Sequence, residues 1–288
     1  MCPHCKSRQI KKRGFYPRAI GKPHKIQRFY CHQCRRTFST QSTAPDRREY
    51  KPYVNPEIYR LLMSGVSQRR CARLVGVDRK TVAAKMQKLA AQVRAKNAAS
   101  TYKSSVQTVV FDEMETFEHS KCKPLSIAIA VEEGSRRIIA TRVAQMPAKG
   151  RLVEISRRRY GYRKDCRRRA IREVLQRVKL TCPNIKTIKS DECPRYPRLI
   201  RECLPGVNHL PSKSRKACIV GQGELKEGAF DPLFSLNHTC AMVRDNIKRL
   251  SRRTWCTTKD KDRLQDLLDL YGHYHNEVID GNRRPMRI

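Results

Sequence analysis

Two apolar segments of this chain lead into an aspartate, and each has the composition of a buried β-strand. The segment 106–113 closes on Asp112, and the segment 185–192 closes on Asp191. Short runs rich in β-branched residues are typical of strands rather than helices. Carboxylates at the ends of neighbouring strands are what a protein needs to hold a divalent metal ion against a phosphodiester.

The region that contains these segments has the pattern of a single mixed sheet. Three strand-like runs follow one another from residue 106, and a basic stretch at 157–169 then leads into alternating helices and strands. This order predicts an α/β fold with a mixed sheet. Besides the two aspartate strands, the expected elements are strands at 124–131, 137–143 and 206–210 and helices at 170–179 and 196–203.

The chain is strongly basic, with 63 Lys and Arg against 26 Asp and Glu and a net charge of +37. A partner of opposite charge is the simplest reason for such self-repulsion, and nucleic acid is the commonest one. A ribosomal or membrane-surface protein is the alternative. No apolar run approaches the roughly 18 residues that span a bilayer, and no apolar leader is present. We therefore expect a cytoplasmic, nucleoid-associated protein.

The chain has 13 cysteines, and four of them form two Cys-x-x-Cys pairs near its start. Each pair is typical of a knuckle that presents two thiolates to one ion, and two knuckles complete a tetrahedral zinc site. The basic, aromatic segment between the pairs would supply the strands of a zinc ribbon over residues 1–45. A redox-active pair is the alternative, although redox motifs rarely occur as two matched pairs. The predicted zinc ligands are Cys2, Cys5, Cys31 and Cys34.

Residues 46–100 have the pattern of a helix-turn-helix domain followed by a linker. Asn55 is expected to cap a first helix and Ser67 a second, Gly76 breaks the second, and Asp78 caps a third. The third helix would present basic side chains to a DNA major groove, as recognition helices do. An ordinary helical hairpin is the alternative interpretation. The predicted DNA contacts in this domain are Arg79, Lys80 and Lys85.

The segment 236–250 is expected to form a late helix with two distinct faces, at about 100° per residue. An apolar face with Cys240, Val243, Ile247 and Leu250 would pack on the sheet. A polar face would follow a DNA backbone, and a solvated basic helix without a ligand is the alternative. This polar face comprises Asn237, Arg244, Lys248 and Trp255.

Together these motifs resemble the short bacterial insertion-sequence transposases of the DDE superfamily, in particular the group with a zinc ribbon. The resemblance covers nearly the whole chain and implies a ribonuclease-H-like catalytic domain over 101–288. Members of the group have a Glu seven residues before an Arg on the last helix, whereas this chain has Asn237 seven residues before Arg244. Besides the zinc ribbon and the helix-turn-helix, the matching segments are Phe-Asp-Glu-Met at 111–114, Ser-Asp-Glu at 190–192 and the basic segment 246–255.

The resemblance implies a transposase that binds the terminal inverted repeats of an insertion sequence, cleaves DNA and joins the ends to target DNA. It also implies a homodimer or higher oligomer. The catalytic residues would be Asp112, Asp191 and Asn237, a variant Asp-Asp-Asn site that holds two Mg²⁺ or Mn²⁺ ions. Other third ligands remain open, namely His238, Glu224 and Glu227. Further DNA contacts would come from Arg244, Lys248 and Arg252.

Two other functions remain open. Because Asn237 carries no charge, the chain could be a catalytically inactive, domesticated DNA-binding regulator. A structural RNA-binding protein would explain the charge but not the two aspartates.

Overall fold

The computed structural model describes residues 1–17, 25–42, 44, 49–99, 106–213, 231–251, 254–279 and 281. The chain divides into two compact units, Met1–Tyr59 and Arg60–Pro285. The boundary falls inside helix α1 (Asn55–Met63). The second and third helices of the helix-turn-helix segment belong to the larger unit.

The first unit contains a small antiparallel sheet of strands β1 (Ile10–Pro17), β2 (Lys25–Cys31) and β3 (Thr37–Ser39), in that order. Phe29 lies opposite Phe38 in the register of β2 and β3, and the two rings stack with their centroids 5.5 Å apart. Both rings are only half-buried, and Ile26 and Cys31 are the buried apolar residues of the strands, so the sheet has almost no core of its own.

A 3₁₀ turn, η2 (Pro52–Val54), leads directly into α1. Asn55 has helical backbone angles, φ −58° and ψ −47°, and its N–H donates to the carbonyl of Pro52. An N-cap residue is normally extended. The prediction that Asn55 caps the first helix is therefore wrong, because the preceding turn already supplies the start of the helix.

The second and third helices, α2 (Gln68–Val75) and α3 (Arg79–Ala99), begin as predicted, and α2 also ends as predicted. Ser67 is extended and accepts a hydrogen bond from a backbone N–H of α2 at 3.4 Å. Gly76 ends α2 with a φ of 68°, which favours glycine. Asp78 accepts a hydrogen bond from a backbone N–H of α3 at 2.6 Å. Each of these signals acts within one turn of the helix that it bounds.

The larger unit contains a five-stranded mixed sheet with the order β6-β5-β4-β7-β8. Strands β4 (Thr108–Glu118), β5 (Ser120–Glu132) and β6 (Ile138–Gln145) are antiparallel. Strand β7 (Thr187–Asp191) pairs in parallel with β4, and β8 (Asn208–Ser212) pairs in parallel with β7. The predicted α/β fold with a mixed sheet is confirmed.

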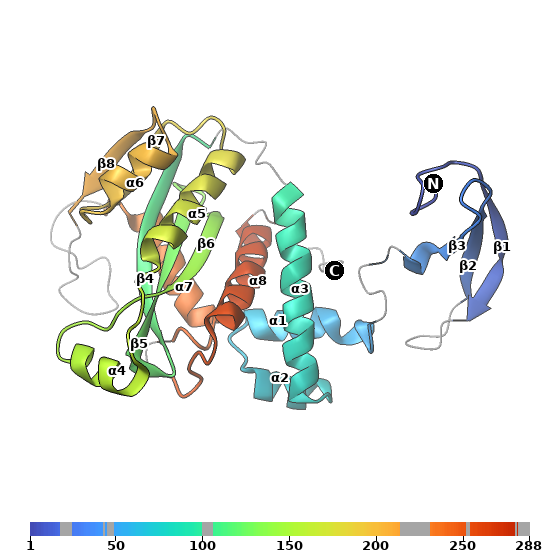
Figure 1. Ribbon diagram of the computed structural model, residues 1–288, viewed down its shortest axis with the longest axis horizontal. Helices are drawn as coiled ribbons and strands as arrows, with labels where there is room; N and C mark the ends of the chain where they lie inside the picture. Colours follow the sequence, from blue (N-terminus) through green and yellow to red (C-terminus); the bar gives the residue numbers. More distant parts are fainter. Residues whose placement is uncertain are drawn as a thin grey trace. The chain divides into compact units, whose positions relative to one another are not determined.

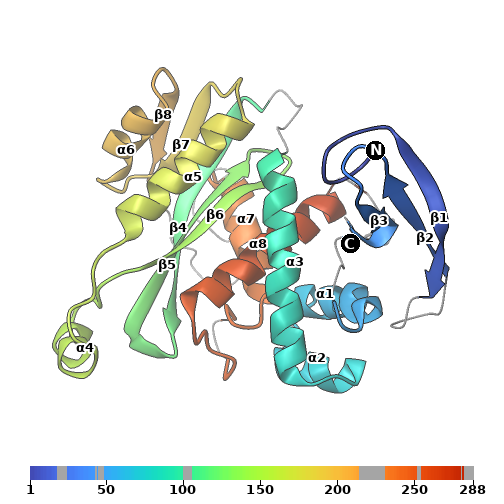
Figure 2. The same ribbon diagram turned by 45° about the vertical axis from the view of Figure 1, so that its right-hand side comes forward.

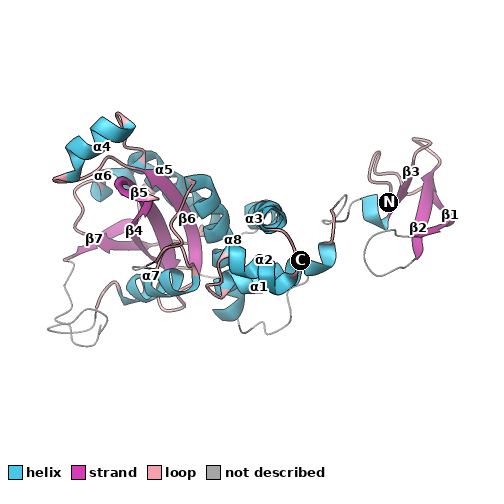
Figure 3. Ribbon diagram, turned by 90° about the horizontal axis from the view of Figure 1, so that it is seen from below, coloured by secondary structure: helices cyan, strands magenta, loops and turns pink. Residues whose placement is uncertain are grey.

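Helices cover both faces of this sheet (Figures 1 and 3). On one face α5 (Arg167–Thr181) and α6 (Tyr196–Cys203) pack on β4, β5 and β6, and α7 (Phe234–Asn246) packs on β4 and β5 from the other face. The core under α5 and α6 includes Val109, Phe111, Ala128, Ala130, Ile171, Leu175, Ile188 and Leu199.

Helix α3 lies alongside α8 (Lys261–Ile279), which in turn packs on β6 (Figures 1 and 2). Arg94 of α3 donates to Asp266 at 2.9 Å and to Asp269 at 2.7 Å, and both carboxylates belong to α8. These carboxylates are 7% and 14% exposed, whereas the side chain of Arg94 is 46% exposed. The long third helix is thus fixed to the side of the sheet.

Helix α4 (Leu152–Tyr160) was not expected from the sequence, which predicted only a basic stretch at this point. Ser156 is the buried residue within the helix, so α4 has no apolar stripe of the usual width. The Ser156 hydroxyl donates to the carbonyl of Cys122 on β5 at 2.7 Å. This hydrogen bond fixes the helix to the end of the β4–β5 hairpin.

Gly65, in the turn before α2, should be the glycine most sensitive to substitution. Its φ is +73°, and an added Cβ would lie 3.3 Å from the carbonyl oxygen of Asp245. Gly134 has a similar φ of +78° with no atom within 4 Å of an added Cβ. Gly65→Ala should therefore lower the free energy of unfolding by about 1–2 kcal/mol from backbone strain alone and further because of the close contact. Gly134→Ala should lose only the free energy that corresponds to backbone strain. If denaturant titrations gave the same loss of unfolding free energy for both variants, this account would be contradicted.

None of the described helices combines the length and the apolar composition needed to cross a bilayer.

Candidate functional site

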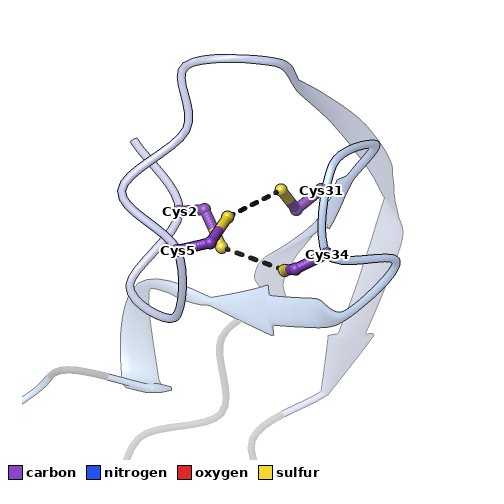
Figure 4. Close-up of side chains that lie close together, drawn as sticks. All are labelled: Cys2, Cys5, Cys31 and Cys34. Carbon is purple, nitrogen blue, oxygen red and sulfur yellow. Dashed lines mark hydrogen bonds between the residues drawn. The ribbon is translucent and has the colours of Figure 1, made fainter.

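The four paired cysteines converge on one point in the first unit (Figure 4). The sulfurs of Cys2 and Cys34 lie 3.6 Å apart, those of Cys5 and Cys31 lie 3.5 Å apart, and all four lie within 4.8 Å of one another. A tetrahedron of sulfurs around zinc has edges of about 3.8 Å, given a Zn–S distance of about 2.3 Å. The arrangement fits a structural zinc ion.

The backbone of each knuckle supports this arrangement in the same way. The residue after each second cysteine has a positive φ, 61° for Lys6 and 55° for Arg35, which folds the chain back on itself. The backbone N–H of Cys34 lowers the pKa of the Cys31 thiol, since an N–H that points at sulfur stabilises the thiolate. The thiolate is the form that binds zinc.

Asp112 and Asp191 are brought together by the parallel pairing of β4 and β7. Val110 lies opposite Lys189 in this register, and continuing it by two residues places Asp112 beside Asp191. Strand β7 ends at Asp191, as predicted. The prediction that the first strand closes on Asp112 is wrong, because β4 runs on to Glu118 in its pairing with β5. Asp112 thus lies beside the last residue of β7, at the point from which β4 continues paired with β5 alone.

Burial raises the pKa of Asp112 to about 6, and the charge of Asp191 adds to this effect while the backbone N–H of Glu113 opposes it. That N–H donates to the Asp112 carboxylate at 2.6 Å, and the hydroxyl of Tyr196 donates to the same oxygen at 3.1 Å. Two carboxylates this close repel each other, and a divalent cation between them would remove the repulsion. This acid pair of Asp112 and Asp191 therefore has the ligand chemistry that a divalent cation prefers.

A second shielded cluster, not anticipated from the sequence, holds Glu113 beside the acid pair. The Glu113 carboxylate is 7% exposed and accepts hydrogen bonds from Ser126 at 2.5 Å, Arg195 at 2.8 Å and Tyr196 at 3.3 Å. The ring of Tyr196 packs edge-on against Phe111, with the centroids 5.0 Å apart. Because the single hydroxyl proton of Tyr196 is shared between Asp112 and Glu113, it fixes both carboxylates relative to α6.

Of the three predicted catalytic residues, Asp112 and Asp191 lie side by side, and the side-chain amide of Asn237 makes its hydrogen bond to another acid. Asn237 is exposed, and its amide N–H donates to Asp231 at 2.8 Å. His238 lies 3.2 Å from the guanidinium of Arg136. Cys240, one turn further along α7, is buried, and its pKa is raised to about 12 by burial and also by the charge of Asp112. This face of α7 is therefore the one near the acid pair. Glu224 and Glu227 lie outside the described residues.

The predicted DNA contacts differ in exposure. Arg79 and Lys80, at the start of α3, are exposed, but Lys85 is only 4% exposed, which makes it a poor candidate for contact with a groove. Arg244 is half-buried on α7, and Lys248 is exposed beyond the end of that helix. Arg252 lies outside the described residues.

Helix α7 is shorter than predicted, because it ends at Asn246 and Ile247 is extended. Lys248 and Trp255 therefore do not continue the polar face of the helix that carries Asn237. The predicted apolar residues Cys240 and Val243 are buried, as expected.

The raised pKa of Asp112 predicts an unusual pH dependence of stability without divalent metal. A carboxyl whose pKa is raised on folding favours the native state when protonated, so its contribution is present below about pH 3.8 and is lost as the pH rises through about 6. Asp112→Asn imitates the protonated form. The free energy of unfolding of the variant should equal that of the wild type near pH 3.5 and exceed it by up to about 3 kcal/mol at pH 7.5. A tenfold change in proton affinity corresponds to about 1.4 kcal/mol.

Chemical denaturation across this pH range in EDTA measures the difference. Glu192→Gln is the matched control, because Glu192 is an exposed acid adjacent to Asp191 and should give a curve parallel to the wild type. Added Mg²⁺ should stabilise the wild type and so reduce the difference in free energy of unfolding between the wild type and Asp112→Asn. Parallel curves for Asp112→Asn and the wild type would argue against a strained acid pair.

No protein-family model matches the chain, and no curated protein matches it in sequence.

Proposed function

We propose that this chain is a DNA transposase of the zinc-ribbon group of the DDE superfamily, with a ribonuclease-H-like catalytic domain. The observation that carries the proposal is the acid pair, in which Asp112 and Asp191 occupy adjacent parallel strands. These are the first and fourth strands of the sheet in chain order, the arrangement of ribonuclease-H-like nucleases. The four-cysteine cluster and the capped helices α2 and α3 add the DNA-binding modules that such an enzyme requires.

The acid pair would hold the catalytic Mg²⁺ or Mn²⁺ through the carboxylates of Asp112 and Asp191. A divalent cation, when bound there, polarises the scissile phosphate and neutralises its charge. Tyr196 holds the Asp112 carboxylate in position through its hydroxyl. Arg195 is 38% exposed and anchored by Glu113, so it supplies a cation for a phosphate beside the acid pair.

Asn237 would act as the third ligand through its amide oxygen. Its amide nitrogen donates to Asp231, which leaves the oxygen as the atom able to bind a cation. Water would first attack the phosphodiester at the end of the element and release a 3′-hydroxyl. That hydroxyl would then attack a phosphodiester of the target and form the joined product.

The zinc ribbon and the exposed start of α3, with Arg79 and Lys80, would bind the terminal inverted repeats. Joining two ends to one target requires at least a dimer. The test is to incubate the zinc-loaded protein with DNA that carries the inverted repeats flanking its coding region. We expect Mg²⁺-dependent nicks at the repeat boundaries and joined products; DNA that stays intact in both Mg²⁺ and Mn²⁺ would overturn the proposal.

A catalytically inactive DNA-binding regulator is the second candidate, favoured by the uncharged Asn237 and its engagement with Asp231. The two functions differ in metal affinity, because a regulator has no need of a cation at the acid pair. Calorimetric titration of the zinc-loaded protein with Mn²⁺ separates them. Heat of binding that disappears in Asp191→Asn supports the enzyme, and no heat in the wild type supports the regulator.

A further inference from the structure

Helix α4 ends in a run of basic residues that the proposed mechanism at the acid pair does not use. Arg157, Arg158 and Arg159 occupy its last turn and are all exposed, and Lys164 follows, also exposed. None of these four side chains takes part in an ion pair with another described residue. Between them Tyr162 exposes 81% of its surface. Unpaired arginines around an exposed aromatic ring are typical of a nucleic-acid contact.

The helix that carries this run is firmly attached. Besides the buried hydrogen bond of Ser156, the ring of Tyr160 lies edge-on to His119, with the centroids 5.9 Å apart, and Lys123 lies 5.5 Å above the same ring. Arg163 is 9% exposed and lies 3.8 Å from Glu118. The cations are therefore presented from a fixed support, which lowers the entropic cost of binding a ligand.

Helix α4 lies beyond the end of β4, in the direction in which that strand leaves Asp112 (Figure 1). From Asp112 to Glu118 the strand advances about 20 Å, at about 3.3 Å per residue. A DNA duplex rises about 3.4 Å per base pair. A duplex attacked at the acid pair and lying along β4 therefore reaches α4 after about six base pairs.

Two arginines of the larger unit lie near the acid pair. Arg167 pairs with Asp165 at 2.5 Å, and its pKa is raised first by Asp165 and also by the more distant Glu113. Arg195 then binds Glu113 directly at 2.8 Å. Both arginines thus lie near Glu113, the residue next to Asp112, and each is paired with an acid.

We propose that α4, through Arg157, Arg158 and Arg159, binds the phosphate backbone of the target duplex about six base pairs from the point of attack. This assignment rests on the proposed function. Three consecutive residues fan over about 200° of a helix, so these arginines do not enter one groove together but contact phosphates along a surface. Contact of this kind is independent of sequence. In the proposed reaction the target is the duplex without the terminal repeats, whose recognition is assigned to α3.

The test compares two triple variants of the full-length, zinc-loaded protein that lose equal charge. One replaces Arg157, Arg158 and Arg159 with Gln. The control replaces three exposed cations that lie outside α4, by Lys179→Gln, Arg201→Gln and Lys259→Gln. Affinity for a 40-base-pair duplex without terminal repeats is measured between about 50 and 200 mM salt. Each lost phosphate contact lowers the salt slope by about 0.9.

The α4 variant should therefore lose about 2.7 from the slope, so that the wild-type affinity falls roughly fortyfold more than that of the variant over this range. The control should keep a slope close to the wild type. The single variant Arg158→Gln, with a loss of about 0.9, checks that the effect is graded and not caused by misfolding. Equal slopes for the two triple variants would overturn the proposal.

A second measurement identifies the duplex and separates this inference from the proposed function. Pre-cut terminal-repeat ends are offered with a plasmid target, and the α4 variant should join them at least tenfold more slowly than the control. Normal joining by the α4 variant would overturn the assignment to target DNA. If the wild type joins no ends at all, the proposed function fails and the assignment to target DNA fails with it, whereas the salt slopes still decide whether α4 binds DNA.

Discussion

Replacing Asp112 or Asp191 with Asn should reduce DNA cleavage and joining by at least about a thousandfold. Asparagine keeps the shape of the side chain and removes the charge that would bind the cation. Metal-ion catalysis contributes several kcal/mol to a phosphoryl-transfer barrier, and each 1.4 kcal/mol is about tenfold in rate. The measurement is the initial rate of end cleavage in Mg²⁺ at saturating DNA.

The matched control is Glu192→Gln, which removes an exposed acid adjacent to Asp191 and should leave the rate unchanged. DNA affinity should be kept or increased in both aspartate variants, because each loses a negative charge near a polyanion. This separates a defect in chemistry from a defect in binding. Cleavage within tenfold of the wild type in either variant would remove that residue from the proposed mechanism.

Replacing Cys31 with Ser should abolish zinc binding and unfold the ribbon. The three-stranded sheet has little to hold it together without metal, since Ile26 is the buried aliphatic residue of its strands and Phe29 and Phe38 are only half-buried. Structural zinc in small domains contributes about 10–16 kcal/mol of apparent binding free energy at pH 7. That contribution far exceeds what so small a core supplies.

Metal analysis of the purified protein should give about one zinc per chain for the wild type and almost none for Cys31→Ser. Limited proteolysis should cut the variant within β1 and β2, which are rich in Lys and Arg. Cys256→Ser is the control, because Cys256 is a half-buried cysteine outside the cluster and should keep the zinc and the protection. A full equivalent of zinc in Cys31→Ser would contradict the four-thiolate site.

The features that could be predicted from the sequence are those set by short-range chemistry. Ser67, Gly76 and Asp78 act within one turn, and each bounds a helix as expected. The knuckles were equally predictable, because a Cys-x-x-Cys spacing fixes where two sulfurs point. The prediction that Asn55 is an N-cap failed for an equally local reason, because the turn just before it already starts the helix.

Features that depend on packing were missed. The apolar spacing of Val243, Ile247 and Leu250 suggested a helix to residue 250, yet the chain leaves the helix after Asn246 and buries Ile247 and Leu250 without it. Helix α4 has too few buried residues to give a periodic signal. The burial of Lys85 is likewise a result of packing.

The surroundings of the acid pair could not be predicted at all. Glu113 on β4 meets Arg195 and Tyr196, which lie more than 80 residues later in the chain. No periodicity records which side chains meet when β7 pairs with β4. The sequence could indicate that two aspartates end up near each other, but not that a tyrosine hydroxyl would join Asp112 to Glu113.

The most direct test of the central claim is to replace one non-bridging oxygen of the scissile phosphate with sulfur. Mg²⁺ binds sulfur poorly, whereas the softer Mn²⁺ accepts it. If a cation held by Asp112 and Asp191 contacts that phosphate, cleavage of one sulfur diastereomer should fall at least about tenfold in Mg²⁺ and recover in Mn²⁺. Equal cleavage of the oxygen and sulfur substrates in both metals would contradict the account.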